Sequence, residues 1–206
     1  PEEYWVLGAR VAKKVEPRAP FIVRLAQLDG EKARVPDEAT ATALREDLDD
    51  RVLRIRRIVR REISRRAPPP YITSTLQQAA SRVLGYTPAR AMKIAQSLYE
   101  GVDLGEGPVG LITYMRTDSV AIAREAQERC REWVAQAFGP EYVPDRPNVY
   151  RSRAGAQEAH EAIRPTDPFR TPEALSGKMP PEEWRLYRLI WERFVASQMA
   201  PALIAQ

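Results

Sequence analysis

The stretch G-L-I-T-Y-M-R-T-D-S, residues 110–119, carries the strongest local signals in this 206-residue chain. Its apolar start leads into Tyr114 and Arg116, which stand two apart and would share one face of a strand. Thr117-Asp118-Ser119 then predicts a helix start, because short hydroxyl and carboxylate side chains cap helix N-termini. A phenol, a fixed cation and free backbone N–H groups together suit a phosphate. The stretch therefore indicates a candidate phosphoryl-transfer site.

Tyr114 has two interpretations at this point. A phenol with an ordinary pKa of roughly 10 is a poor nucleophile unless cations or a base favour the phenolate. Arg116 is placed to supply that cation and to neutralise charge that develops on a phosphate. The alternative is that Tyr114 is an aromatic strand residue packed in a core, and spacing alone favours this alternative.

The composition fits a globular chain with a core of its own. Hydrophobic residues make up 44% of the 206 residues, enough for one large domain or two small ones. The net charge is only +4, so bulk charge does not establish a nucleic-acid partner. Arginine outnumbers lysine 27 to 5 and favours bidentate phosphate contacts, although an arginine-rich genome explains this bias equally well.

The numbers of cysteines and histidines and the lengths of the apolar runs exclude several classes of protein. One Cys and one His cannot build a disulfide framework or a closed zinc site, and Cys130 is predicted to be a buried, reduced thiol. No apolar run approaches about 18 residues and no secretory leader is visible, so we expect no membrane contact and a cytoplasmic location. The chain starts at Pro1 and ends at Gln206 without terminal signals, and we interpret it as a piece of a longer protein.

The first third of the chain predicts strands and one helix. Residues 4–12 and 20–28 are apolar and rich in β-branched side chains, and Asp29-Gly30 after them is a hairpin signal. Residues 36–48 predict a short helix with acids at its start. Near-alternation over 52–58 favours a strand with an arginine-studded outer face, and a basic helix is the alternative for 51–66. Pro68–Pro70 then predict a stiff connector.

The remainder predicts helices. Thr73-Ser74-Thr75 begins one that Gly85 ends, with Ser74 and Gln77 as a capping-box pair. Thr87-Pro88 begins the next, and the short turn between the two resembles a helix-turn-helix. A helix from Ser119 to Gly139 and a last helix from Pro181 carry apolar residues at helical spacing, which predicts a core. The hydroxyls and amide of 73–77 could also bind a sugar–phosphate backbone, but capping explains them more simply. The fold class is α+β and predominantly helical.

His160 is the only histidine, and it stands within A-Q-E-A-H-E-A-I-R-P-T, residues 156–166. In a helix, His160 and Arg164 would share a face and could hold a phosphate together. The alternative is a histidine satisfied by a neighbouring carboxylate, Glu158 or Glu161.

Taken together, residues 110–119, 156–166 and I-T-S-T-L-Q-Q-A-A-S-R (72–82) resemble the type IA DNA topoisomerases. The resemblance extends over essentially the whole chain, and three long motifs in the right order are specific. Met115 stands where the topoisomerase III branch usually has proline, which favours the topoisomerase I branch.

The resemblance implies that Tyr114 attacks a single-strand phosphodiester and becomes joined to the 5′-phosphate. It implies that Arg116 contacts the scissile phosphate and that His160 lies close to the DNA. Arg164 and Thr113 belong to the same motifs and are expected to bind DNA. The enzyme would relax negatively supercoiled DNA by cleaving, passing and resealing a strand without ATP, and no phosphate-binding P-loop is visible in the sequence.

The resemblance also implies an architecture. Residues 1–69 would belong to a β-rich arch, 70–200 would form an inserted helical tyrosine domain with a helix-turn-helix-like core, and 201–206 would return to the arch. Mg²⁺ would be bound by a domain that is not in this chain, so the piece alone is expected to be inactive. Its expected partners are single-stranded or underwound DNA in the nucleoid and the missing N- and C-terminal domains. The alternative within the enzyme class is a reverse gyrase, which would need a helicase-like ATPase upstream of this chain. The alternative outside this class is a non-catalytic helix-turn-helix DNA-binding module.

Overall fold

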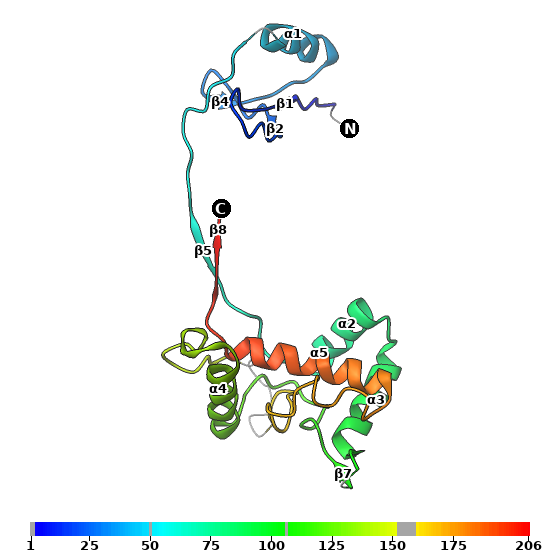
Figure 1. Cartoon of the computed structure of the whole chain (residues 1–206). Helices are drawn as coiled ribbons and strands as arrows, with labels where there is room; N and C mark the ends of the chain where they lie inside the picture. Colours follow the sequence, from blue (N-terminus) through cyan, green and yellow to red (C-terminus); the bar gives the residue numbers. More distant parts are fainter. Residues whose placement is uncertain (1–2, 50, 106, 152–159) are drawn as a thin grey trace. The chain divides into compact units, whose positions relative to one another are not determined.

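The computed structural model describes residues 3–49, 51–105, 107–151 and 160–206. The chain divides into two units, Pro1–Val59 and Arg60–Gln206. The described residues form five α-helices and eight short strands, which confirms the predicted mixture of helix and strand (Figure 1).

The first unit contains two small antiparallel pairs and one helix. Strand β1 (Gly8–Val11) pairs with β2 (Phe21–Arg24), and β3 (Gln27–Leu28) pairs with β4 (Glu31–Lys32). The turn between β3 and β4 is Asp29-Gly30, with φ of 52° and 90°, as a two-residue hairpin turn requires. The predicted hairpin is confirmed. Helix α1 (Glu38–Asp49) follows, and its hydrogen bonds from Thr40 hold the pKa of the Asp37 carboxyl below its usual value.

The strand predicted over 52–58 is wrong. Residues 51–61 have no regular structure and are exposed, and the strand in this region is β5 (Glu62–Arg65). An alternating pattern forms a strand only where a second strand lies opposite to accept its hydrogen bonds. In the part of the chain that the structure describes, that partner is β8 (Ala202–Ala205), which pairs antiparallel with β5 in a register that places Glu62 opposite Ala205.

The second unit is a helical body around α5 (Pro181–Gln198), which starts at the proline that the sequence predicts. Leu186, Tyr187, Ile190 and Phe194 on this helix are fully buried. Helix α2 (Thr73–Ala79) continues through a π turn (Ala80–Leu84), and α3 (Pro88–Glu100) packs on α5. Helix α4 (Arg124–Phe138) contributes the buried residues Cys130 and Val134 to the core, and Gly139 is its C-cap, as predicted (Figure 1).

The helix-turn-helix signals are largely confirmed. The first helix ends at Gly85, whose φ of 69° is the left-handed conformation that favours glycine. Thr87 caps α3, with its Oγ1 accepting a hydrogen bond from Arg90 N at 3.3 Å. The predicted capping box of Ser74 with Gln77 is wrong, because Ile72 is the N-cap and Thr75 Oγ1 accepts from Ile72 N at 3.0 Å.

Two other predicted helices differ from the structure. Helix α4 begins at Arg124 and not at Ser119, because the hydroxyls of Thr117 and Ser119 accept hydrogen bonds from the N–H groups two residues on. Such local turns use the same residue types as a helix cap. Residues 160–166 are extended, so His160 and Arg164 share no helix face, while 156–159 lie outside the described residues.

The remaining short elements lie in the connections. Strands β6 (Val102–Asp103) and β7 (Pro108–Val109) pair with each other in the connection between α3 and the central segment (residues 110–121), and a 3-10 turn (Pro140–Tyr142) follows α4. Cys130 on α4 is buried, and burial raises the pKa of its thiol to about 12. It is therefore the inert thiol that the sequence predicts. Among the residues described, no helix has the length and apolar character needed to cross a membrane.

Candidate nucleic-acid site where three segments meet

The site is built where 71–75, 110–121 and 160–166 lie side by side. Tyr71 forms an antiparallel bridge with Ile163, and Ile112 forms one with Pro165. Ile163 N donates to Tyr71 O at 2.8 Å and Thr113 N donates to Arg164 O at 2.9 Å. The three sequence motifs, far apart along the chain, are thus joined through their backbones.

Thr73 ties the start of α2 to the central segment. Its Oγ1 lies 2.8 Å from Met115 O and 3.0 Å from Thr117 O, and it accepts a hydrogen bond from Thr117 N at 2.9 Å. Thr73 N also donates to Thr117 O at 3.0 Å. The backbone on both sides of Arg116 is therefore fixed by one threonine side chain.

We expect Thr73→Val to destabilise the second unit by about 1–3 kcal/mol, because it keeps the side-chain shape but leaves Thr117 N without its acceptor. Urea denaturation measures the change. Ser74→Ala is the matched control, since Ser74 is exposed on the next position of the helix, and it should cost less than about 0.5 kcal/mol. Equal effects of the two substitutions would contradict the role of Thr73.

Thr113 makes the equivalent connection to the third segment. Its Oγ1 donates to Ala162 O at 2.7 Å and accepts from Arg164 N at 3.0 Å. Ala162 N in turn donates to Ala121 O at 2.8 Å. The third segment is held on both sides of Ile163, which is fully buried.

Side chains alternate along the central segment. Tyr114, Arg116 and Asp118 are exposed, whereas the residues between and after them, Met115, Thr117 and Ser119, are buried. Tyr114 and Arg116 are therefore both exposed, as alternation predicts, but the strand predicted to carry them is absent among the described residues, where Met115 and Arg116 lie in a bend. The helix N-terminus predicted directly after them is absent from the described segment, so its N–H groups cannot contribute to a phosphate site.

Arg116 and His160 meet at an open pocket of about 550 Å³. The pocket is also lined by Asp118 and by polar residues of α2; its full lining is Ile72, Thr73, Ser74, Gln77, Arg116, Thr117, Asp118 and His160. Among the described residues, neither Arg116 nor His160 has a hydrogen-bond or ion-pair partner. Both side chains are thus available to donate hydrogen bonds to a ligand.

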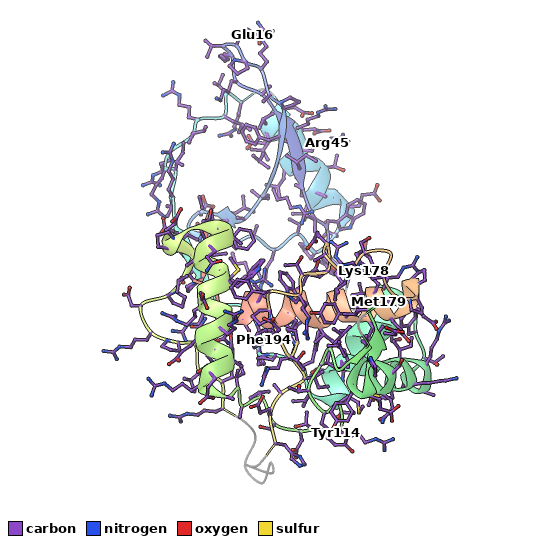
Figure 2. The ribbon with its side chains drawn as sticks, turned by 60° about the horizontal axis from the view of Figure 1, so that its bottom comes forward. Glu16, Arg45, Tyr114, Lys178, Met179 and Phe194 are labelled. Atoms are coloured by element: carbon purple, nitrogen blue, oxygen red, sulfur yellow. The ribbon has the colours of Figure 1, made fainter. Side chains whose placement is uncertain are left out.

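Tyr114 does not line this pocket. Its ring lies edge-on against Tyr99 of α3, with 5.4 Å between the ring centroids, and 44% of the residue is exposed. Figure 2 labels Tyr114 at the lower edge of the view. Burial raises the pKa of the Tyr71 and Tyr187 phenols, which makes those two tyrosines poor nucleophiles. Tyr114 is exposed and stands two residues before Arg116 in the chain.

Helix α3 sets the start of the central segment. Leu111 N donates to Leu98 O at 2.7 Å, and a Cβ on Gly110 would lie only 2.9 Å from Tyr99 O. Glycine is required at 110 because the backbone approaches the helix end so closely. This close approach also places the Tyr114 ring beside Tyr99.

Arg164 is engaged within the protein. Its Nη2 lies 2.6 Å from Glu161 Oε2 and its Nη1 donates to Pro165 O at 3.0 Å. Only 12% of the Arg164 side chain is exposed. Glu161 thus pairs with Arg164, and not with His160 as the sequence allowed.

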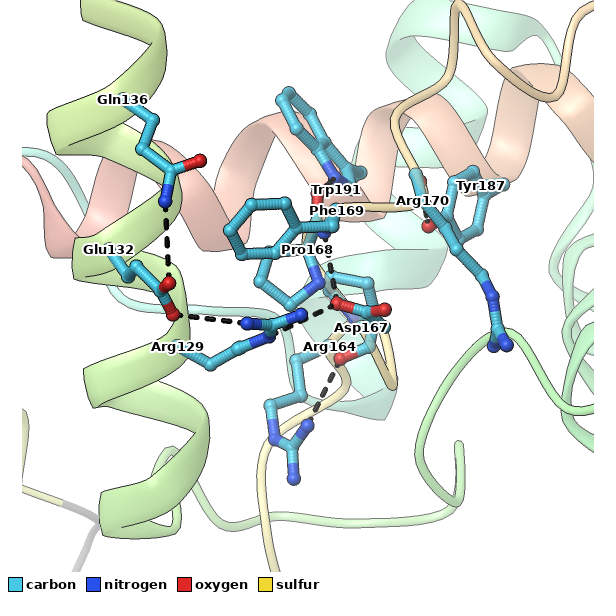
Figure 3. Close-up of polar contacts among 11 residues, drawn as sticks. Arg129, Glu132, Gln136, Arg164, Asp167, Pro168, Phe169, Arg170, Tyr187 and Trp191 are labelled. Carbon is cyan, nitrogen blue, oxygen red and sulfur yellow. Dashed lines mark hydrogen bonds and ion pairs between the residues drawn. The ribbon is translucent and has the colours of Figure 1, made fainter.

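The chain beyond Arg164 is anchored to α4 and α5. Arg129 on α4 pairs with Glu132 at 3.0 Å, approaches Asp167 at 3.8 Å and lies 4.0 Å from the centre of the Phe169 ring (Figure 3). The Trp191 indole of α5 donates to Pro168 O at 2.9 Å (Figure 3). These contacts hold the third segment at its far end and so fix where it leaves the site.

A metal ion has no evident place here. Across residues 3–49, 51–105, 107–151 and 160–206, no group of three or more His, Cys, Asp or Glu side chains could hold one. Asp118 is the single carboxylate among the described residues that line the pocket, so this lining lacks the set of oxygen ligands that Mg²⁺ binds.

Sequence reasoning missed three parts of the site. It treated Thr73 as a cap, although the partners of its hydroxyl lie 42 and 44 residues away. It did not single out Asp118 at the pocket or Tyr99 against the Tyr114 ring. Local spacing gives no signal for such contacts, because they depend on how α2 and α3 pack.

The class of protein to which the three joined segments belong follows from comparison with known families. A family model described as DNA topoisomerase matches residues 1–206, and the chain belongs to that family, in its bacterial type IA class. The resemblance of the three motifs is thereby confirmed.

Within the family, similar proteins are named DNA topoisomerase 1. The one from Xylella fastidiosa is 47% identical over 210 residues, which cover 98% of this chain and 25% of the relative. The one from Helicobacter pylori is 49% identical over 168 residues, covering 81% of this chain and 23% of the relative. These names confirm the branch that Met115 favours.

A solved structure supports the same assignment. Full-length topoisomerase I from Thermotoga maritima is 33% identical, with a TM-score of 0.74 over 98% of this chain and 30% of that chain. The chain thus spans about a quarter of the length of the curated relatives it matches.

Proposed function

We propose that this chain carries the nucleophile of a type IA topoisomerase, which cleaves and reseals one DNA strand. One observation carries the proposal: an exposed tyrosine, Tyr114, stands two residues before Arg116, and Arg116 and His160 line one pocket. Family membership makes DNA the substrate class, since the matched proteins are named DNA topoisomerase 1.

The reaction is an exchange of esters at phosphorus. The Tyr114 Oη attacks the scissile phosphate, the bond from phosphorus to the 3′ oxygen breaks, and a 5′-phosphotyrosine and a 3′-hydroxyl form. The phenol loses one proton and the departing 3′ oxygen gains one. Attack by the 3′-hydroxyl reverses these steps, so resealing and relaxation of negative supercoils need no ATP.

Arg116 and His160 act on the phosphate in this proposal. A guanidinium without a partner in the described chain can neutralise negative charge as the phosphorus becomes five-coordinate. The His160 side chain lines the same pocket and supplies a second donor to the DNA backbone. Tyr114 can attack a phosphate bound by these two residues in either of two ways. Its ring moves away from Tyr99, or the DNA strand extends from the pocket to the ring.

Thr113 and Arg164 contribute to DNA binding as positioning residues. The Thr113 hydroxyl and the Arg164 guanidinium already bond to Ala162 O and Glu161. We propose that they shape the third segment, which presents His160. The Mg²⁺ of the complete enzyme would be held by residues outside this chain, and we assign no step to it here.

We further propose that 70–200 form a tyrosine domain inserted into an arch formed by 1–69 and resumed at 201–206. The pairing of β5 with β8, at the two ends of the helical body, supports this arrangement. The partners would then be single-stranded or underwound DNA of the nucleoid and the remaining domains of a longer cytoplasmic protein.

Binding of single and double strands tests the proposal. We expect the 206-residue chain to bind a 20-nucleotide single strand at least about tenfold more tightly than the matching duplex in a gel shift, with little base preference. Arg116→Ala should weaken single-strand binding about tenfold and lower the log–log salt slope by about 0.7.

Arg188→Ala is the matched control, because Arg188 is half-exposed but already paired with Glu192 at 2.6 Å. It should change the affinity less than about twofold. Tighter, sequence-dependent binding of the duplex would instead support a helix-turn-helix module and contradict the proposal.

A further inference from the structure

A second open pocket, of about 440 Å³, adjoins the one at Arg116. The two pockets share Ser74 and Gln77 of α2. The second continues along the helix and its π turn, and it is lined by Ser74, Gln77, Gln78, Ser81, Arg82 and Pro88. The polar surface that begins at Arg116 therefore extends along the outer side of this helix.

The packing of the helix explains why this side is polar and free. Leu76, Ala79 and Ala80 are buried in the core. Ser74 and Gln78 are exposed on the other side four residues apart, and Ser81 and Arg82 follow three and four residues after Gln78, so the exposed residues form one stripe. The π turn at Ala80–Leu84 carries the far end of that stripe, and π turns are frequent at functional sites.

The chemistry of the second pocket suits a nucleic-acid backbone. The described residues that line it offer hydroxyls, amides and one guanidinium, and none of them is a carboxylate. Arg82 is exposed and has no ion-pair partner in the described chain, whereas nearby Arg90 pairs with Glu182 at 2.6 Å. Such donors contact phosphates and sugars without reading bases.

We propose that a single DNA strand continues from the Arg116 pocket along the outer side of α2, and that Arg82 binds one of its phosphates. Arg82 stands eight positions after Ser74, about 12 Å along a helix, which corresponds to roughly three or four phosphates at the spacing of a stacked strand. The inference rests on the proposed function, because it takes single-stranded DNA as the ligand of the Arg116 pocket.

Fluorescence anisotropy with labelled thymidine oligonucleotides of 4 and 12 nucleotides tests the proposal on the 206-residue chain. We expect Arg82→Ala to weaken binding of the 12-mer roughly five- to tenfold and to lower its salt slope by about 0.7. The same substitution should remove most of the gain in affinity from the 4-mer to the 12-mer. Circular dichroism checks that each variant is folded.

Arg90→Ala is the matched control and should change the 12-mer affinity less than about twofold, because this arginine is paired on the protein surface. If Arg116→Ala weakens binding while Arg82→Ala behaves like Arg90→Ala, the DNA strand does not continue along α2, and the proposed function stands. If the unsubstituted chain binds neither oligonucleotide, the proposed function fails, and this inference fails with it.

Discussion

Tyr114→Phe is expected to abolish plasmid relaxation and the covalent protein–DNA adduct, by roughly 10³-fold or more, in a longer protein that carries this chain. The substitution removes the one atom that attacks phosphorus in the proposed reaction, and no other group replaces a lost nucleophile. The fold should not change, because the residue is 44% exposed and the phenylalanine ring can keep the edge-on contact with Tyr99. Relaxation of negatively supercoiled plasmid on agarose gels measures the effect.

Tyr142→Phe provides the control for that experiment. Tyr142 lies on the 3-10 turn, packs against Phe138 and is 46% exposed, about the same residue exposure as Tyr114. Relaxation should be unchanged in this variant. Retained relaxation in Tyr114→Phe, with an adduct still trapped, would overturn the assignment of the nucleophile.

Phe194→Ala is expected to lower the free energy of unfolding of the second unit by about 3–5 kcal/mol. Phe194 lies on α5 and is fully buried in the core that α3 and α4 share with that helix. Truncation removes apolar surface from the core and leaves a cavity among side chains that cannot collapse into it. Because a domain is stable by only about 5–15 kcal/mol, thermal denaturation should show a much lower Tm.

Phe138→Ala is the matched control at the end of α4. Phe138 is 51% exposed and touches Trp133 and Tyr142 with its ring. The loss should stay below about 1 kcal/mol, since about half of the residue already faces solvent. Equal losses for the two phenylalanines would contradict the core as described.

Helix boundaries could be predicted where the signal was local. Thr87-Pro88 and Pro181 begin helices because a fixed φ and a missing N–H suit the first helical position, whatever the rest of the chain does. Gly85 ends a helix for an equally local reason, its left-handed φ of 69°.

Predictions failed where the same residues serve two local structures. Thr117 and Ser119 resemble a helix cap, yet each hydroxyl closes a short turn because the chain there is held by Thr73 and by the third segment. The strand predicted over 52–58 failed because pairing with β8 occurs at Glu62–Arg65 instead. No pattern within either stretch contains that information.

The site itself could not be derived from spacing. Alternation predicted that Tyr114 and Arg116 share a face, but the contact of Thr73 with Met115 and Thr117 spans more than 40 residues. The resemblance of three motifs to one family supplied what spacing lacked, and the structure then added Tyr99 and Asp118.

The most direct measurement is the identity of the residue that carries DNA. A longer protein containing this chain would be incubated with a single-stranded oligonucleotide, denatured rapidly to trap the cleaved state, and digested for peptide mass spectrometry. We predict that the peptide containing Tyr114 carries the nucleotides through their 5′-phosphate, and that the other fragment ends in a free 3′-hydroxyl. An adduct on any other residue, or one linked through a 3′-phosphate, would contradict the assignment of Tyr114.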